Sequence, residues 1–171
     1  MNPTIETIFN RKSVRKFTDE KVSKEILEQL VKAGMAAPSA VNLQPWVFIA
    51  IDDREILKQL HDTLPYAKML KNAAIVVCGD NSIKSKNSGN QYWVQDCSAA
   101  TQNILLAAEA LELGAVWTAV FPVKDRMESV VKILNLPDHI TPLCVIPIGY
   151  PASDNKPIDK WKPGNLHWQK W

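Results

Sequence analysis

The sequence predicts one domain of the α/β or α+β class, in which helices flank a central sheet. Apolar runs of strand length alternate along the chain with segments whose apolar residues recur at helical spacing. The chain has 171 residues, 46% of them hydrophobic, which is enough to bury a core without disulfides or metal ions. We therefore expect residues 1–171 to form a single folded unit.

The first third of the chain predicts two helices and a strand. Residues 4–10 are expected to form a short helix. Ser23 is a suitable N-cap for a second helix, whose apolar residues keep helical spacing as far as Gly34. After a loop punctuated by prolines, residues 46–51 are continuously apolar, which is typical of a strand covered on both faces.

The next segments predict a helix, a strand and a loop. Asp53 can cap a helix that runs through Leu64, and residues 73–78 form an apolar run of strand length. Residues 81–91 are mostly polar, so we expect a surface loop there.

The longest predicted helix covers residues 93–111, about 30 Å of rod. Its apolar residues fall at steps of three and four, and its alanines allow another element to pack closely. We expect Gly114 to end this helix as its C′ residue. A strand over 115–120, a helix over 125–134 and a strand over 143–148 complete the predicted core.

The C-terminal arm, residues 152–171, does not fit a compact monomer. It has proline and glycine breaks and no apolar periodicity, yet it holds three of the six tryptophans: Trp161, Trp168 and Trp171. Because such side chains are unfavourable in water, we expect the arm to lie on protein, with another subunit as the candidate surface.

Charge and composition exclude several classes of function. The chain carries 20 Lys and Arg against 18 Asp and Glu, and this net charge of +2 is too mild to indicate a nucleic-acid or membrane-surface partner. The N-terminus lacks an apolar signal-peptide core, and no apolar run approaches the roughly 18 residues of a membrane helix. We expect a soluble, cytoplasmic protein.

The spacing of cysteine, histidine and glycine excludes common metal and phosphate sites. The three cysteines and three histidines are too scattered for CxxC or HExxH patterns. The six glycines are never closer than ten positions, whereas a P-loop or dinucleotide fingerprint needs them close together. Charged side chains would therefore have to hold a bound phosphate. We assign no histidine a catalytic role, and we expect Asp96 to be a buried, hydrogen-bonded structural residue.

Three segments are candidate binding motifs. Residues 11–17 (RKSVRKF) combine four cations with a hydroxyl, which suits phosphate, although taken alone such a run is more often a solvated turn. Residues 38–46 (PSAVNLQPW) place amides and rigid prolines before a predicted strand. Their amide groups could form hydrogen bonds with a bound heterocycle, or the segment could simply connect two elements. Lys160 and Lys162 would share one side of an extended arm, and an exposed lysine pair is the common alternative.

Taken in order, these segments resemble the nitroreductase family of FMN-dependent oxidoreductases. Residues 11–17 resemble its Arg-x-Ser-x-Arg/Lys-x-Phe motif, and residues 38–46 its Pro-Ser-x-x-Asn-x-Gln-Pro-Trp motif. The alanine-rich helix ending LELGAVW, the segment LNLPDHITPLCVIPIGYP and the basic arm match further landmarks, so the resemblance covers nearly the whole chain. It implies an α+β fold with a mainly antiparallel central sheet flanked by helices. It also implies an intertwined homodimer with exchanged arms and two FMN sites at the interface.

The resemblance also implies which residues contact FMN. Four residues of the first motif would contact the phosphate, ribityl chain and pyrimidine edge of one flavin: Arg11, Lys12, Ser13 and Arg15. Four residues of the second motif would approach the same flavin from the other subunit: Pro38, Ser39, Ala40 and Asn42. Lys68 would lie near the isoalloxazine, and the backbone of Thr118 and Ala119 would lie beside the ring. Lys160 and Lys162 would form a C-terminal clamp on the phosphate. No metal ligand or acid–base pair is implied, because the cofactor carries the hydride chemistry.

Three features depart from the family pattern. Lys162 stands where arginine is usual, so a phosphate would meet a point charge there in place of a bidentate fork. Residues 118–121 lack the glycines that many members have at this place. The chain is also short for the family and has no room for a long lid.

The resemblance implies an NAD(P)H-dependent reductase of nitroaromatic, quinone-like or related small electrophiles, with ping-pong turnover. Two alternatives remain open at this level. One is a specialised flavoenzyme of the same fold, dehalogenase-like or flavin-fragmenting, and the other is a non-catalytic flavin-binding protein.

Overall fold

In the described part of the chain, five strands form one sheet in the order β1-β2-β5-β3, with β4 also pairing with β5, and every strand pair is antiparallel. The computed structural model describes residues 1–86 and 89–171, so residues 87–88 of the expected 81–91 loop lie outside the described residues. The strands are β1 (Trp46–Ile51), β2 (Ala73–Asp80), β3 (Gly114–Ala115), β4 (Thr118–Ala119) and β5 (Ile140–Gly149). The fold is therefore α+β, as the resemblance implies.

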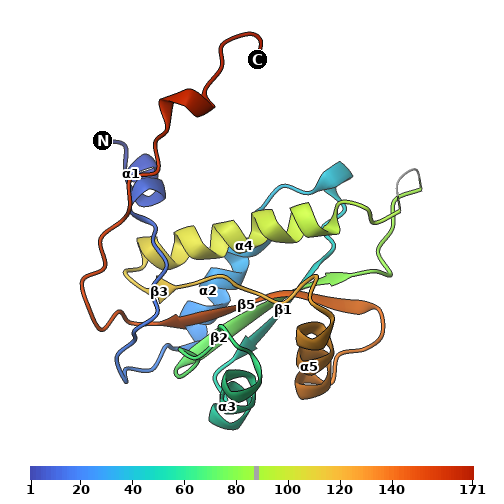
Figure 1. The fold of residues 1–171 in the computed structure, drawn as a ribbon. Helices are drawn as coiled ribbons and strands as arrows, with labels where there is room; N and C mark the ends of the chain where they lie inside the picture. The colour runs from blue at the N-terminus through green and yellow to red at the C-terminus, as the bar shows by residue number, and fades with distance from the viewer. Residues whose placement is uncertain (87–88) are drawn as a thin grey trace.

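Helices cover both faces of the sheet (Figure 1). One layer contains α2 (Lys24–Met35) and α4 (Trp93–Ala110), and the other contains α3 (Arg54–Thr63) and α5 (Lys124–Leu134). The short helix α1 (Pro3–Asn10) contacts α4, and two one-turn 3-10 helices are η1 (Ala40–Asn42) and η2 (Pro163–Asn165). No helix in the described part of the chain is both long enough and apolar enough to cross a membrane.

Strand β2 separates two apolar cores because its side chains alternate between the faces. Ile75 and Val77 pack with α2 and α4, whereas Val76 packs with α3 and α5. All but the last residue of β2 are buried. The expectation that residues 46–51 are covered on both faces is wrong: β1 is an edge strand, and Ala50 is exposed.

The expected helix caps at Ser23 and Asp53 are confirmed. The Ser23 hydroxyl accepts a hydrogen bond from the backbone N–H of Ile26, and the Asp53 carboxylate accepts from those of Glu55 and Ile56. Each cap satisfies N–H groups that have no partner inside the helix.

The end of α4 differs from the expectation. The left-handed residue is Glu112 (φ 59°), and the N–H of Leu113 donates to the carbonyl of Ala108 at 2.8 Å, which is a Schellman ending. Gly114 instead begins β3, where a Cβ atom would lie 2.6 Å from Cγ1 of Val14. This glycine is needed for close packing rather than for helix termination.

The single strand expected over residues 115–120 is two short strands, β3 and β4. The register with β5 continues through the break, because Ala115 faces Ile148 and Thr118 faces Val145. Val116 therefore falls opposite Pro147, which has no N–H to donate to the ladder. A proline in the partner strand thus interrupts a strand that its own apolar pattern predicts.

Replacing Gly114 by alanine tests the close packing against Val14. We expect Gly114→Ala to lower the free energy of unfolding by about 1–3 kcal/mol, because the added methyl group overpacks a buried contact. Gly164→Ala is the matched control, since a Cβ there meets nothing within 4 Å. Urea unfolding measures both variants, and equal midpoints for the two would contradict the packing role of Gly114.

The C-terminal arm leaves the body after β5. Its start is tied to the N-terminal segment by hydrogen bonds between the N–H of Thr18 and the carbonyl of Tyr150, and between the N–H of Ala152 and the carbonyl of Lys16. Every residue from 156 to 171 is exposed. Figure 1 shows the arm passing α1 and ending far from the sheet.

Candidate functional site

Segment 11–17 is attached to the body at several points, one of which is the buried side chain of Val14. Val14 is buried, and its backbone N–H donates to the carbonyl of Ala115 at 3.0 Å, while Ser13 forms a parallel bridge to the same residue. Because side chains alternate in an extended segment, an inward Val14 leaves Ser13 and Arg15 exposed. The segment can therefore present polar side chains from a fixed backbone.

Four of the expected site residues line one pocket of about 500 Å³: Arg15, Lys68, Thr118 and Ala119. We call it the central pocket. Its walls also include Tyr66, Trp117 and Arg126, none of which the sequence analysis selected. Segments that are far apart in sequence thus combine cations, aromatic rings and backbone at one place.

Lys68 is oriented toward fixed acceptors beside the central pocket. Its Nζ atom donates to the carbonyl oxygens of His61 at 2.5 Å and of Asp62 at 3.2 Å. The Asp62 carboxylate itself is paired elsewhere, since hydrogen bonds from Lys58 and His61 lower its pKa to about 2. Backbone carbonyl groups therefore hold the charge of Lys68 at the pocket, and no ion pair among residues 1–86 and 89–171 includes Lys68.

Thr118 and Ala119 contribute backbone rather than side chains. The Thr118 hydroxyl donates to the carbonyl of Val145 at 2.6 Å, so it is already used inside the sheet. The carbonyl of Ala119 accepts a hydrogen bond from the guanidinium of Arg126 at 3.1 Å.

Arg11 and Lys160 line a second pocket, of about 740 Å³, between the end of α1 and the arm. We call it the arm pocket. Arg11 and Arg15 lie at the two ends of one extended segment, about 13 Å apart at strand-like spacing. The structure thus places two of the expected cations in each of two pockets along this segment, and Arg126 joins Arg15 and Lys68 in the central pocket. Lys162 is exposed and lines neither pocket.

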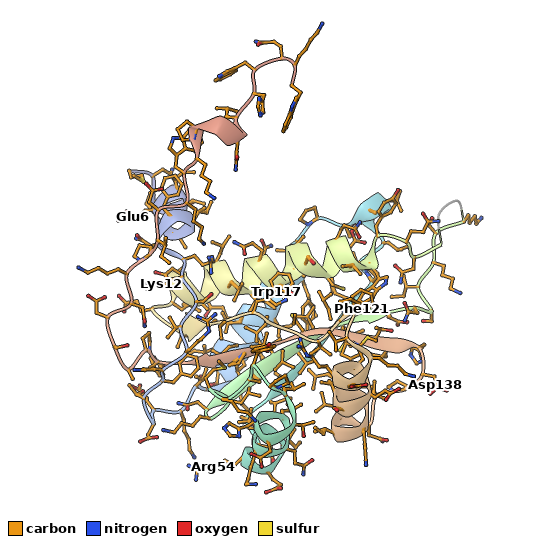
Figure 2. The ribbon with its side chains drawn as sticks, viewed as in Figure 1. Glu6, Lys12, Arg54, Trp117, Phe121 and Asp138 are labelled. Carbon is orange, nitrogen blue, oxygen red and sulfur yellow. The ribbon has the colours of Figure 1, made fainter. Side chains whose placement is uncertain are left out.

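Lys12 has a partner that the sequence analysis missed. Its Nζ atom lies 2.8 Å from Oε1 of Glu109, and both side chains are mostly buried, at 24% and 16% exposed. Figure 2 shows Lys12 beside the C-terminal end of α4. The pair fastens the first motif to that helix.

The second motif is fastened to the other end of α4. Asp96 is buried, and its Oδ1 atom accepts a hydrogen bond from the backbone N–H of Ala40 at 2.9 Å, so the expectation of a buried, hydrogen-bonded residue is confirmed. The Ser39 hydroxyl accepts from the N–H of Gln44 at 2.9 Å. Backbone at positive φ follows at three non-glycine residues: Val41, Asn42 and Gln44. Such backbone is costly and persists where side chains such as Asp96 and Ser39 hold it.

The two motifs do not meet within one chain. Glu109, which holds the first motif, and Asp96, which holds the second, are about 20 Å apart along the axis of α4. Pro38, Ser39, Ala40 and Asn42 therefore lie away from Arg11, Ser13 and Arg15 in this chain.

The cysteines are unsuited to nucleophilic chemistry. All three are buried, and burial raises the pKa of Cys78 and of Cys144 to about 12 and also raises that of Cys97. Across residues 1–86 and 89–171, the His, Cys, Asp and Glu side chains form no group of three or more that could hold a metal ion.

Comparison with known proteins identifies a consistent set of relatives. The family model described as "Nitroreductase family" matches residues 8–64 and 57–150. A protein of Methanothermobacter thermautotrophicus, provisionally named NADH dehydrogenase/NAD(P)H nitroreductase, is 45% identical over 169 residues, covering 98% of this chain and 87% of that protein.

Two solved structures extend the comparison to the fold. A Parabacteroides distasonis protein of the same provisional name superimposes with a TM-score of 0.94 and 51% identity, over 100% of both chains. A Desulfovibrio desulfuricans nitroreductase, solved in complex with FMN, has a TM-score of 0.81 and 29% identity, over 100% of this chain and 99% of that one.

Proposed function

The chain belongs to the nitroreductase family, and from that premise we propose that it is an FMN-dependent oxidoreductase. In this proposal NADH or NADPH is the electron donor, and the acceptors are nitroaromatic, quinone-like or related electrophilic small molecules. The observation that carries the proposal is the central pocket, where Arg15, Lys68 and the backbone of 118–119 converge. The family relative solved with FMN supports the choice of cofactor.

The residues present fit FMN. Arg11 and Lys160 in the arm pocket can donate to a phosphate, and the glycine spacing leaves that task to cationic side chains. The pocket also contains one carboxylate, Asp159, whose Oδ1 atom accepts a hydrogen bond from the backbone N–H of Trp161 at 2.9 Å. At the other end of the same segment, the central pocket has an aromatic wall at Trp117 and cations beside it. We propose that the first motif holds one flavin along its length, with Lys12 and Ser13 between the two ends.

The role of the chain around FMN is electrostatic and positional. When bound, FMN supplies the chemistry that accepts a hydride from the nicotinamide donor and passes it to the acceptor. Arg15 and Lys68 would stabilise the negative charge that develops on the pyrimidine edge. The backbone of Thr118 and Ala119 would pack against the flavin ring and so fix its position in the pocket. No side chain has to move a proton in this scheme, so no acid–base pair is assigned.

We further propose that residues 1–171 act as an intertwined homodimer with exchanged arms. The separation of the two motifs along α4 supports this, because residues 38–42 would reach the flavin from the partner subunit. The exposed arm supports it as well, since Trp161 is 66% and Trp168 is 73% exposed in the single chain. Lys160 and Lys162 would then close on the phosphate. A cytoplasmic location stays a prediction from the sequence.

The test is the colour of the purified protein. We expect a yellow protein with a flavin absorbance spectrum that bleaches under anaerobic conditions when NADH or NADPH is added. A panel of nitroaromatic and quinone acceptors then restores the colour. A colourless protein that binds no added FMN would contradict the cofactor assignment, and a yellow protein that never bleaches would favour a non-catalytic flavin-binding protein.

Steady-state kinetics should show ping-pong turnover. The central pocket lies beside residues 118–119, and in our proposal the donor and the acceptor use the same face of the flavin there in turn. The oxidised donor must therefore leave before the acceptor binds, which gives parallel double-reciprocal lines when both concentrations are varied. Intersecting lines would mean that the two molecules bind together and would contradict the shared pocket.

A further inference from the structure

We propose that Arg126 and Tyr66 form a subsite of the central pocket for an anionic oxygen group, a phosphate or a carboxylate, on the molecule that gives or takes electrons there. This inference rests on the proposed function and deepens it, because it names a chemical feature of the substrate. Neither residue was selected from the sequence motifs.

Two contacts fix the guanidinium of Arg126 at the pocket wall. Its Nη1 atom donates to the carbonyl of Ala119 at 3.1 Å, and its Cζ atom lies 5.0 Å from the centre of the Tyr66 ring. The side chain is therefore oriented by a hydrogen bond on one side and an aromatic face on the other. A guanidinium has five N–H groups, so most of its donors remain for another molecule.

No carboxylate neutralises Arg126 within the described part of the chain. The ion pairs there join other residues, and the lining of the central pocket contains three cations and no Asp or Glu. An oriented arginine without a carboxylate partner is well suited to bind a carboxylate or phosphate of another molecule, because it can form two parallel hydrogen bonds with that group.

The proposed flavin contacts leave Arg126 unused. Arg15 and Lys68 serve the pyrimidine edge in that assignment, and Arg11 and Lys160 serve the phosphate. Arg126 sits next to Ala119, the exposed residue of the pair that would approach the ring. Its position suits a substrate group bound at the mouth of the pocket. Tyr66, 67% exposed, offers that molecule an aromatic surface.

The test compares matched substrates that differ in one anionic group. NADPH and NADH differ by a ribose phosphate, and 4-nitrobenzoate and 4-nitrobenzyl alcohol differ by a carboxylate. In Arg126→Ala we expect the KM of the anionic member to rise by about tenfold or more in at least one pair, with kcat little changed. The other member should stay within about threefold. The pair that responds identifies whether the donor or the acceptor carries the anion.

Controls separate binding of the anion from a structural role. Lys124→Ala removes the same charge two positions earlier on α5, from an exposed side chain outside the pocket lining. This variant should leave the ratio of the two KM values unchanged within each substrate pair. Arg126→Lys keeps the charge and should restore part of the selectivity. Calorimetric titration of the purified protein with NADP⁺ and NAD⁺ measures donor binding without turnover.

The outcomes are distinct from those for the proposed function. Equal losses for both members of each pair, no change in either pair, or the same change in Lys124→Ala would overturn the subsite. Failure of the wild-type protein to be reduced by either donor would contradict the proposed function instead. A tenfold weaker NADP⁺ affinity in Arg126→Ala, with NAD⁺ unchanged, would still support the subsite in that case.

Discussion

Deletion of residues 153–171 is expected to convert a flavin-containing dimer into a flavin-free protein that aggregates. The arm carries three tryptophans that are largely exposed in the single chain, and burying such large apolar side chains on a partner favours association. The same deletion removes Lys160 and Lys162, which we propose as phosphate contacts. Dimer and cofactor should therefore be lost together.

Light scattering after size-exclusion chromatography, with the flavin-to-protein absorbance ratio of each peak, measures both effects. The full-length double variant Lys160→Ala with Lys162→Ala is the control, because it removes the cations and keeps the tryptophans. It should remain a dimer and hold flavin less tightly. A truncated protein that stays monodisperse and fully loaded with flavin would show that the arm has neither role.

Replacement of Arg11 by alanine is expected to weaken FMN binding by about 2–4 kcal/mol, or roughly 30-fold to 700-fold in Kd. Arg11 lines the arm pocket together with Lys160, and its loss would leave a phosphate with too few charge-assisted hydrogen bonds. Titration of the apoprotein with FMN in a calorimeter measures the change.

Two further variants give this measurement its controls. Lys16→Ala removes an exposed cation from the same segment but lies outside both pockets, so we expect FMN affinity to stay near that of the wild type. Lys162→Arg should bind FMN at least as tightly as the wild type, because a guanidinium can meet a phosphate with two hydrogen bonds. If Arg11→Ala and Lys16→Ala bind FMN equally well, segment 11–17 is only a basic surface turn.

Local signals predict the elements of this fold well. The caps at Ser23 and Asp53 and the apolar periodicity of α4 depend on residues a few positions apart, so they can be interpreted without knowing the rest of the chain. The antiparallel sheet follows only from resemblance to the family, since the pattern of elements alone leaves α/β and α+β open.

Contacts between distant segments decide what local signals cannot. Gly114 is a residue type typical of a helix end, yet here a glycine is required because a Cβ atom would collide with the side chain of Val14. The strand that begins at Gly114 is interrupted opposite Pro147 of its partner strand β5. Neither neighbour is close in sequence. The left-handed residue that does end α4 is Glu112, whose type gives no sign of it.

Some residues of the candidate site can be predicted from the sequence, and others are identified only in the folded chain. The motifs at 11–17 and 38–46 are recognisable from residue types alone, because charge and amide groups are properties of the side chains. Glu109 and Arg126 carry no such signal, since their roles come from a 2.8 Å ion pair and a 3.1 Å hydrogen bond to segments that folding brings beside them. The residue types in the sequence therefore determine which chemical groups this protein can use. Which of those side chains act together depends on long-range packing, and only the folded chain provides it.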